Sequence, residues 1–179
     1  MINARGFFEE INPKIVAAET EERSVEQAQR DIYDSHRHRI FSLAYHMSGN
    51  ELEAEQILTD SFTRAFSAAP RPDGNAIDQA LVTELGRHFP LTTTAPAPVN
   101  ESQTMSGRNV RRTDLEEAIQ LLPSTERLLF LLRDVEGYTS EAISQLLGME
   151  QSKVNRTLFS ARIRLRGILS DLEANRAAA

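Results

Sequence analysis

The stretch YTSEAISQLLGMEQSKVNRTLFSARIRLRGIL, from Tyr138 to Leu169, decides the fold of the second half of this chain. It predicts two helices joined by a tight turn, over residues 140–147 and from about residue 151 to 169. Thr139 is the expected N-cap of the first helix, because its hydroxyl can accept a hydrogen bond from a free backbone amide. Gly148 is expected to end that helix, because a residue without Cβ readily takes the left-handed conformation.

The second of these helices combines a narrow apolar stripe with a cationic remainder. Its apolar residues recur at helical spacing and are Val154, Leu158, Ala161, Leu165 and Ile168. Its charged residues up to position 170 are all basic and are Lys153, Arg156, Arg162, Arg164 and Arg166. A short helix, a glycine turn and such a helix fit the major groove of DNA. A solvated basic face on an ordinary helical hairpin is the alternative interpretation.

Composition and charge narrow the class of protein. The chain has 179 residues and a formal net charge of −6, so the basic helix is a local feature on an acidic background. Cysteine is absent, which excludes a disulfide framework and a thiolate metal site. We find neither a signal-peptide pattern nor an apolar run of about eighteen residues, so we expect a cytoplasmic protein without a membrane partner.

Helical periodicity and the scarcity of aromatic residues predict an all-α fold of two small helical domains. The first domain is expected over residues 22–90. Its predicted helices are 22–48, 51–68 and 75–89. Asn50 is the expected N-cap of the second of these helices. Residues 1–21 are interpreted as an N-terminal extension, because Pro13 is expected to interrupt an early helix.

A flexible polar linker is expected between the two domains. Residues 91–113 are rich in Thr, Ala, Pro, Ser and Asn, and they have too few apolar groups to offset the entropy lost on ordering. The second domain, which carries the helix-turn-helix, is expected over residues 114–171. Residues 172–179 are interpreted as a tail that frays.

The sequence does not indicate an enzyme or a cofactor. It contains no nucleophile–base pair with supporting spacing and no Gly-rich phosphate loop. His36 and His38 are two positions apart on a predicted helix and do not face each other, so a solvated face is favoured over a metal site.

Two blocks of sequence resemble bacterial sigma factors, and the compact extracytoplasmic-function (ECF) group of the sigma-70 family is the most similar. LLPSTER at 121–127, RDVEGYTSEAISQLLG at 133–148 and KVNRTLFSAR at 153–162 resemble region four of that family. IYDSHRHRIFSLA at 32–44 and EAEQILTDSFTRAF at 53–66 resemble its region two. Both blocks occur in the family's order across a polar linker, which is more specific than either block alone.

The resemblance implies a protein that binds core RNA polymerase and directs transcription initiation at specific promoters. The second helix of its helix-turn-helix is then expected to read the minus-thirty-five element. The implied base or phosphate contacts are Lys153, Asn155, Arg156, Thr157, Ser160 and Arg164, with Thr139 and Ser140 as backbone contacts. The implied polymerase contacts on the docking helix are Glu53, Gln56, Thr59, Asp60 and Arg64. Promoter DNA and polymerase are the expected partners, and an anti-sigma factor is a further candidate.

One helix departs from the family pattern. In the family, the helix after the docking helix carries aromatic and basic residues that capture the melted minus-ten strand. Here residues 75–89 contain Asp78 and Glu84 and lack that aromatic and basic run. An alternative function therefore stays open, in which a sigma-like interaction protein binds polymerase or DNA without melting a promoter.

Overall fold

The structure, a computed structural model, describes residues 13–92 and 111–177, with side chains from residue 21 onward. Within these residues every regular element is a helix, which confirms the all-α prediction. The elements in chain order are α1 (Pro13–Ser48), α2 (Glu51–Ala68), α3 (Gly74–His88), α4 (Arg112–Gln120), α5 (Ser124–Phe130), the π-helical turn η1 (Leu131–Val135), α6 (Ser140–Leu147) and α7 (Gln151–Ala177). None of the described helices is long and apolar enough to cross a membrane.

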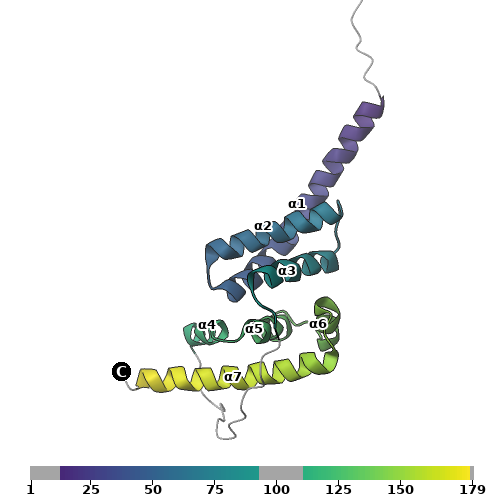
Figure 1. Ribbon diagram of the computed structural model, residues 1–179. Helices are drawn as coiled ribbons and strands as arrows, with labels where there is room; N and C mark the ends of the chain where they lie inside the picture. The colour runs from purple at the N-terminus through teal and green to yellow at the C-terminus, as the bar shows by residue number, and fades with distance from the viewer. Residues whose placement is uncertain (1–12, 93–110, 178–179) are drawn as a thin grey trace, which may run out of the picture.

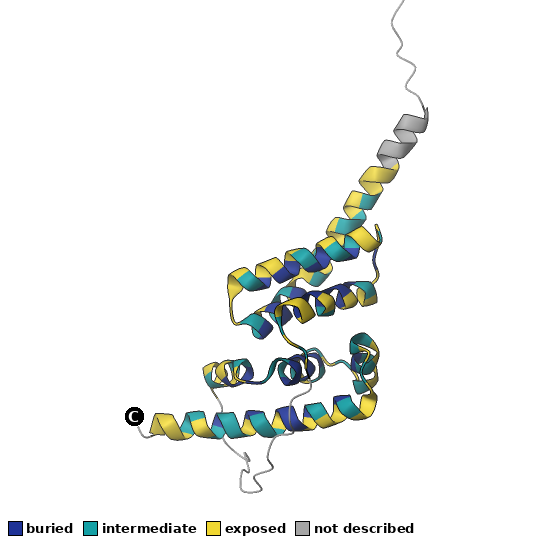
Figure 2. Ribbon diagram, in the orientation of Figure 1, coloured by how far each residue is buried: buried dark blue, intermediate teal, exposed yellow. Residues whose placement is uncertain are grey.

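The first three helices pack side by side around their own apolar side chains (Figures 1 and 2). The fully buried side chains among them are Ile40, Leu43, Met47, Ile57, Ile77, Leu81 and Leu85. Asn50 caps α2 by accepting from the Glu53 amide at 3.1 Å, as predicted. Asp73 caps α3 in the same way through the Ala76 amide at 2.8 Å. The two caps set where α2 and α3 begin.

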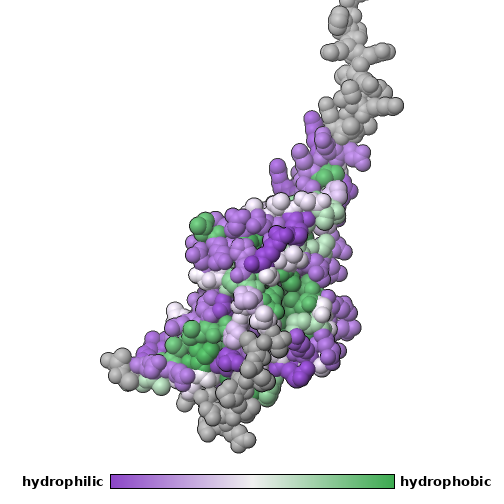
Figure 3. Space-filling model, viewed as in Figure 1, coloured by the Kyte–Doolittle hydropathy of each residue, from purple (hydrophilic) through white to green (hydrophobic). Residues whose placement is uncertain are grey.

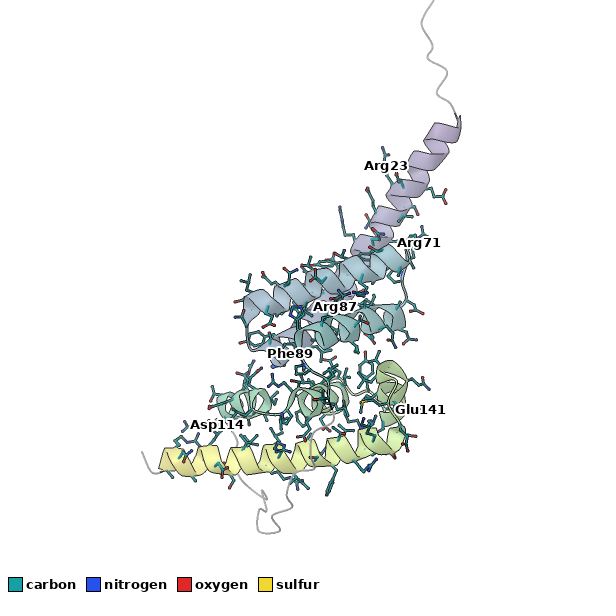
Figure 4. The ribbon with its side chains drawn as sticks, viewed as in Figure 1. Arg23, Arg71, Arg87, Phe89, Asp114 and Glu141 are labelled. Atoms are coloured by element: carbon teal, nitrogen blue, oxygen red, sulfur yellow. The ribbon has the colours of Figure 1, made fainter. Side chains whose placement is uncertain are left out.

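Two boundaries differ from the sequence-based expectation. Helix α1 begins at Pro13 instead of near residue 22, so the second part of the predicted N-terminal extension belongs to this helix. Proline is favoured at the first helical position, where its missing N–H is not needed. The first turns of α1 project beyond the packed helices, and Arg23 lies on this projection (Figure 4).

Helix α7 also runs to Ala177 instead of ending near residue 171. An ion pair of 2.5 Å between Arg176 and Asp114 on α4 ties its last turn to the body. The prediction that residues 172–179 fray missed this ion pair, because Asp114 lies far from Arg176 in the sequence. Residues 93–110, which make up most of the predicted linker, lie outside the described residues, and α4 already begins at Arg112.

Helices α4 to α6 lie on one side of α7, which runs beneath all three (Figure 1). Their core consists of fully or almost fully buried apolar side chains, which are Leu122, Leu128, Leu129, Leu131, Leu132, Ile143, Val154 and Leu158. Hydrophobic side chains also gather on the surface where α4 lies over the C-terminal part of α7 (Figure 3). We call α1–α3 the N-terminal half and α4–α7 the C-terminal half.

The two halves contact each other, with α3 beside α6 and the end of α1 beside α4 and α5. The α7 helix is on the far side of the C-terminal half from α1–α3 (Figure 1). The described helices therefore leave the outer face of α7 uncovered.

Candidate nucleic-acid interface

Helices α6 and α7 form the predicted helix-turn-helix. The Thr139 hydroxyl accepts from the Ala142 amide at 3.0 Å, so the predicted N-cap is confirmed. Gly148 ends α6 with φ of 60° and ψ of 30°, the left-handed conformation expected of it. The Met149 amide then donates to the Ser144 carbonyl at 3.0 Å and completes the turn into α7.

Replacing Thr139 by Ala removes this cap and is expected to destabilise the C-terminal half by about 1 kcal/mol. Thr139→Ser keeps the accepting hydroxyl and serves as the matched control. Urea unfolding followed by circular dichroism measures both variants. Equal stability of the alanine variant and the unsubstituted chain contradicts the cap's role.

The apolar stripe of α7 faces the core as predicted. Val154, Leu158, Ala161 and Leu165 are buried. Ile168, the last residue of the predicted stripe, is partly buried against the core, and Leu169 beside it is buried. This burial determines which residues point outward, because the helix rotates about 100° per residue.

The outer face of the first half of α7 is polar, with one large apolar side chain. Its exposed residues are Gln151, Ser152, Asn155, Arg156 and Phe159. Lys153 and Thr157 are half-buried beside them. The Phe159 side chain is 62% exposed although it is aromatic. Amide, guanidinium and aromatic groups on one face can bind base edges and thymine methyl groups.

Two of the predicted DNA contacts point toward the domain core instead. Ser160 is buried, and its hydroxyl donates to Glu126 Oε1 at 3.0 Å. Arg164 Nε donates to Glu126 Oε2 at 2.9 Å, and Glu126 is only 1% exposed. Both side chains thus fasten α7 to α5, and we leave them out of the proposed DNA surface.

A further arginine of the basic run also has an acidic partner. Arg162 Nη2 and Nε donate to the Asp134 carboxylate at 2.6 and 3.1 Å. This hydrogen bonding raises the pKa of Arg162 above its usual value. The basic run of α7 therefore serves partly to hold the helix in place, and partly to present charge outward.

The start of α6 carries the two predicted backbone contacts. Thr139 is exposed and Ser140 is half-buried, at the end of α6 where the backbone amides point outward. Glu141 lies in the same turn and points away from the body (Figure 4).

The predicted polymerase contacts all lie on α2. Gln56 and Thr59 are exposed, and Asp60 is half-buried and accepts a hydrogen bond from Gln56 Nε2 at 2.9 Å. Glu53 lies 3.2 Å from the ring of His88, and Arg64 pairs with the buried Glu84. The most accessible part of this predicted surface is therefore the turn from Gln56 to Asp60.

The two acids of α3 are buried and paired. Asp78 is 8% exposed and binds Arg39 on α1. Glu84 is 2% exposed and pairs with Arg64 on α2 and with Arg87 at 3.2 Å. These acids are structural, so the exposed face of α3 is neutral and polar along most of its length, with Arg87 near its C-terminal end.

Sequence reasoning missed several residues at these surfaces. Phe159 lies outside the apolar stripe of α7. A large aromatic residue at such a position indicates a contact surface, and this signal was present in the sequence but not used. Leu52, at the start of α2, is 77% exposed and also breaks the apolar pattern of its helix. Glu126 gave no local signal, because its partners lie 34 and 38 positions away. Among the side chains that the structure describes, no cluster of metal-ligating residues occurs.

Comparison with known proteins shows what these elements are similar to. Residues 112–165, from α4 into α7, match the family described as Sigma-70, region 4. The ECF RNA polymerase sigma factor SigE of Mycolicibacterium smegmatis is 24% identical over 163 residues. Residues 112–165 thus match a sigma-70 region 4 domain, and the chain as a whole is similar to extracytoplasmic-function sigma factors.

The similar proteins align with different shares of this chain. The alignment with SigE spans 78% of this chain and 61% of SigE, so part of the relative has no counterpart in the match. The sigma factor RpoE from Bartonella quintana, solved in complex with the anti-sigma factor NepR, superposes with a TM-score of 0.59 at 15% identity. That superposition covers 79% of this chain and 96% of RpoE, and it supports the two-part helical fold.

Proposed function

We propose that the protein is a sigma factor that binds core RNA polymerase and directs initiation at specific promoters. The observation that carries this proposal is the match of residues 112–165, from α4 into α7, to sigma-70 region 4. Within this match, α7 exposes Asn155, Arg156 and Phe159 on its outer face. The cytoplasm, where transcription takes place, is the proposed location.

In this proposal α7 reads the minus-thirty-five element from the major groove. Arg156 is suited to guanine and Asn155 to adenine, because each can make two parallel hydrogen bonds to that base. Phe159 is suited to a thymine methyl group. Lys153 and Thr157 flank these residues and contact phosphates, together with the α6 end at Thr139 and Ser140.

The polymerase docks on α2 in this proposal, through a surface centred on Gln56, Thr59 and Asp60. Glu53 and Arg64 border it. Helix α2 lies in the N-terminal half, away from α7 (Figure 1), and Gln56 and Thr59 are exposed on it. Polymerase and DNA can therefore be bound by different faces. By analogy with the RpoE complex, an anti-sigma factor is a further proposed partner.

Asp60→Arg is expected to lower the affinity for core polymerase by about tenfold or more, because a reversed charge at an interface is repelled. DNA binding measured without polymerase is expected to stay unchanged. Asp171→Arg places the same change on an exposed residue of α7 and is the matched control. Polymerase affinity that survives the Asp60 substitution places the docking surface elsewhere.

A second function is a sigma-like protein that binds polymerase or DNA without melting a promoter. The face of α3 favours it, because the exposed residues are mostly neutral and Phe89 is half-buried. Capture of single-stranded bases normally combines exposed aromatic side chains with positive charge. Permanganate footprinting of promoter complexes separates the two functions. Reactive thymines around the minus-ten element support the sigma factor, and a protected duplex with bound polymerase supports the non-melting protein.

A further inference from the structure

One tyrosine connects the two halves of the molecule. Tyr138 lies just before α6, and its hydroxyl donates to Asp78 Oδ2 on α3. The same hydroxyl accepts from Arg39 Nη1 on α1 at 2.8 Å. Arg39 also pairs with Oδ1 of Asp78. The hydroxyl thus joins a charged pair that is otherwise contained within the N-terminal half.

Each partner in this contact is held by its own half. The Tyr138 amide donates to the Leu132 carbonyl at 2.9 Å, and Arg133 Nη1 donates to the Tyr138 carbonyl at 2.8 Å. On the other side, Asp78 is buried against Arg39. Neither side chain can follow the other when the halves move apart, so the hydroxyl contact reports directly on their relative position.

The other described hydrogen bonds between the halves run from side chains to backbone carbonyls. Gln79 Nε2 donates to the Leu146 carbonyl at 3.2 Å, and Gln120 Nε2 donates to the His46 carbonyl at 2.7 Å. Arg127 donates to the Met47 carbonyl in the last turn of α1. Water can replace each of these bonds on separation, as in interfaces between domains that move.

The closed arrangement is too short to occupy two promoter elements at once. The minus-ten and minus-thirty-five positions are roughly 25 base pairs apart, or roughly 85 Å of B-form DNA. Helix α7, with its 27 residues, is about 40 Å long. Helix α3 lies against α6, the first helix of the helix-turn-helix, so the N-terminal half stays beside the DNA-binding domain in this arrangement.

We propose that Tyr138 and Asp78 form a latch that holds the two halves closed, and that this latch opens before the halves occupy two promoter elements. The need to open at a promoter rests on the proposed sigma function. The closed state itself is a property of the free chain. Polymerase and promoter favour the open state, because only that state offers both binding surfaces at the required separation. By linkage, weakening the latch strengthens binding to any ligand that requires the open form.

The first experiment measures the latch in the free, full-length chain. The chain has no cysteine, so Ser67→Cys on α2 and Asp171→Cys on α7 accept a fluorophore pair for single-molecule energy transfer. Tyr138→Phe in this background is expected to shift the open–closed equilibrium toward open by about five- to tenfold. Tyr33→Phe removes a hydroxyl within the N-terminal half and is the matched control. A distance distribution that Tyr138→Phe leaves unchanged overturns the latch.

The second experiment fixes the closed state. Gln79 and Gln145 line one cavity of about 220 Å³ between α3 and α6, so Gln79→Cys with Gln145→Cys accepts a short bismaleimide tether. The tethered chain is expected to bind polymerase but to lose at least tenfold in promoter-dependent transcription. The two single-cysteine variants, treated with the same reagent, are expected to keep it.

The outcomes separate the two proposals. Full transcription by the tethered chain overturns the latch and leaves the sigma function intact. Absence of transcription by the untethered chain overturns the sigma function, and the energy-transfer result then decides the latch alone.

Discussion

Glu126→Ala is expected to lower the free energy of unfolding by about 2–3 kcal/mol. Glu126 is almost completely buried and accepts hydrogen bonds from Ser160 and Arg164. Removing one partner of a buried ion pair leaves the other charge poorly solvated, which usually costs about 3–5 kcal/mol. The Arg164 side chain is 29% exposed, so water compensates for part of that cost.

Glu116→Ala is the matched control, because Glu116 pairs with Arg112 on the surface of α4. Exposed pairs contribute about 0–1 kcal/mol, so this variant should unfold at nearly the same urea concentration as the unsubstituted chain. A double-mutant cycle with Arg164→Ala isolates the coupling. Equal losses for the two glutamate variants contradict the structural role of Glu126.

Arg156→Ala is expected to weaken binding to the preferred promoter duplex by about 1–3 kcal/mol, if Arg156 reads a base as proposed. Fluorescence anisotropy compares that duplex with a scrambled duplex of equal length. Discrimination between them should fall, because the lost hydrogen bonds are specific to one base.

Arg166→Ala is the control for this prediction, since Arg166 is also exposed on α7 but lies farther from its N-terminal end. Arg166→Ala should weaken binding to both duplexes only slightly and by the same factor. An Arg156→Ala loss that is equal for both duplexes, with a reduced dependence on salt, shows instead that Arg156 binds a phosphate.

The helix-turn-helix could be predicted from sequence because its signals are local. Thr139, Gly148 and the apolar stripe of α7 act within one or two helical turns, and the structure confirms all three. Periodicity gives the angle of a residue around its own helix. It does not show how wide an arc the neighbouring helices cover.

The misplaced residues all have partners far away in the sequence. Ser160 and Arg164 looked like a flank of the DNA face, but α5 reaches around to them with Glu126. Asp78 looked like an acid on a DNA-melting helix, and it is neutralised by Arg39 from α1. The interdomain contact of Tyr138 was invisible for the same reason, because Asp78 lies 60 positions before it.

Run-off transcription from a library of genomic fragments, with core polymerase alone and with the protein added, tests the central claim most directly. The account predicts discrete new start sites that appear only with the protein. Their upstream sequences should share two elements, and Arg156→Ala should weaken use of the one farther from the start site. Polymerase binding in the same reaction, without any new transcript, contradicts the sigma function and leaves a protein that binds polymerase without opening DNA.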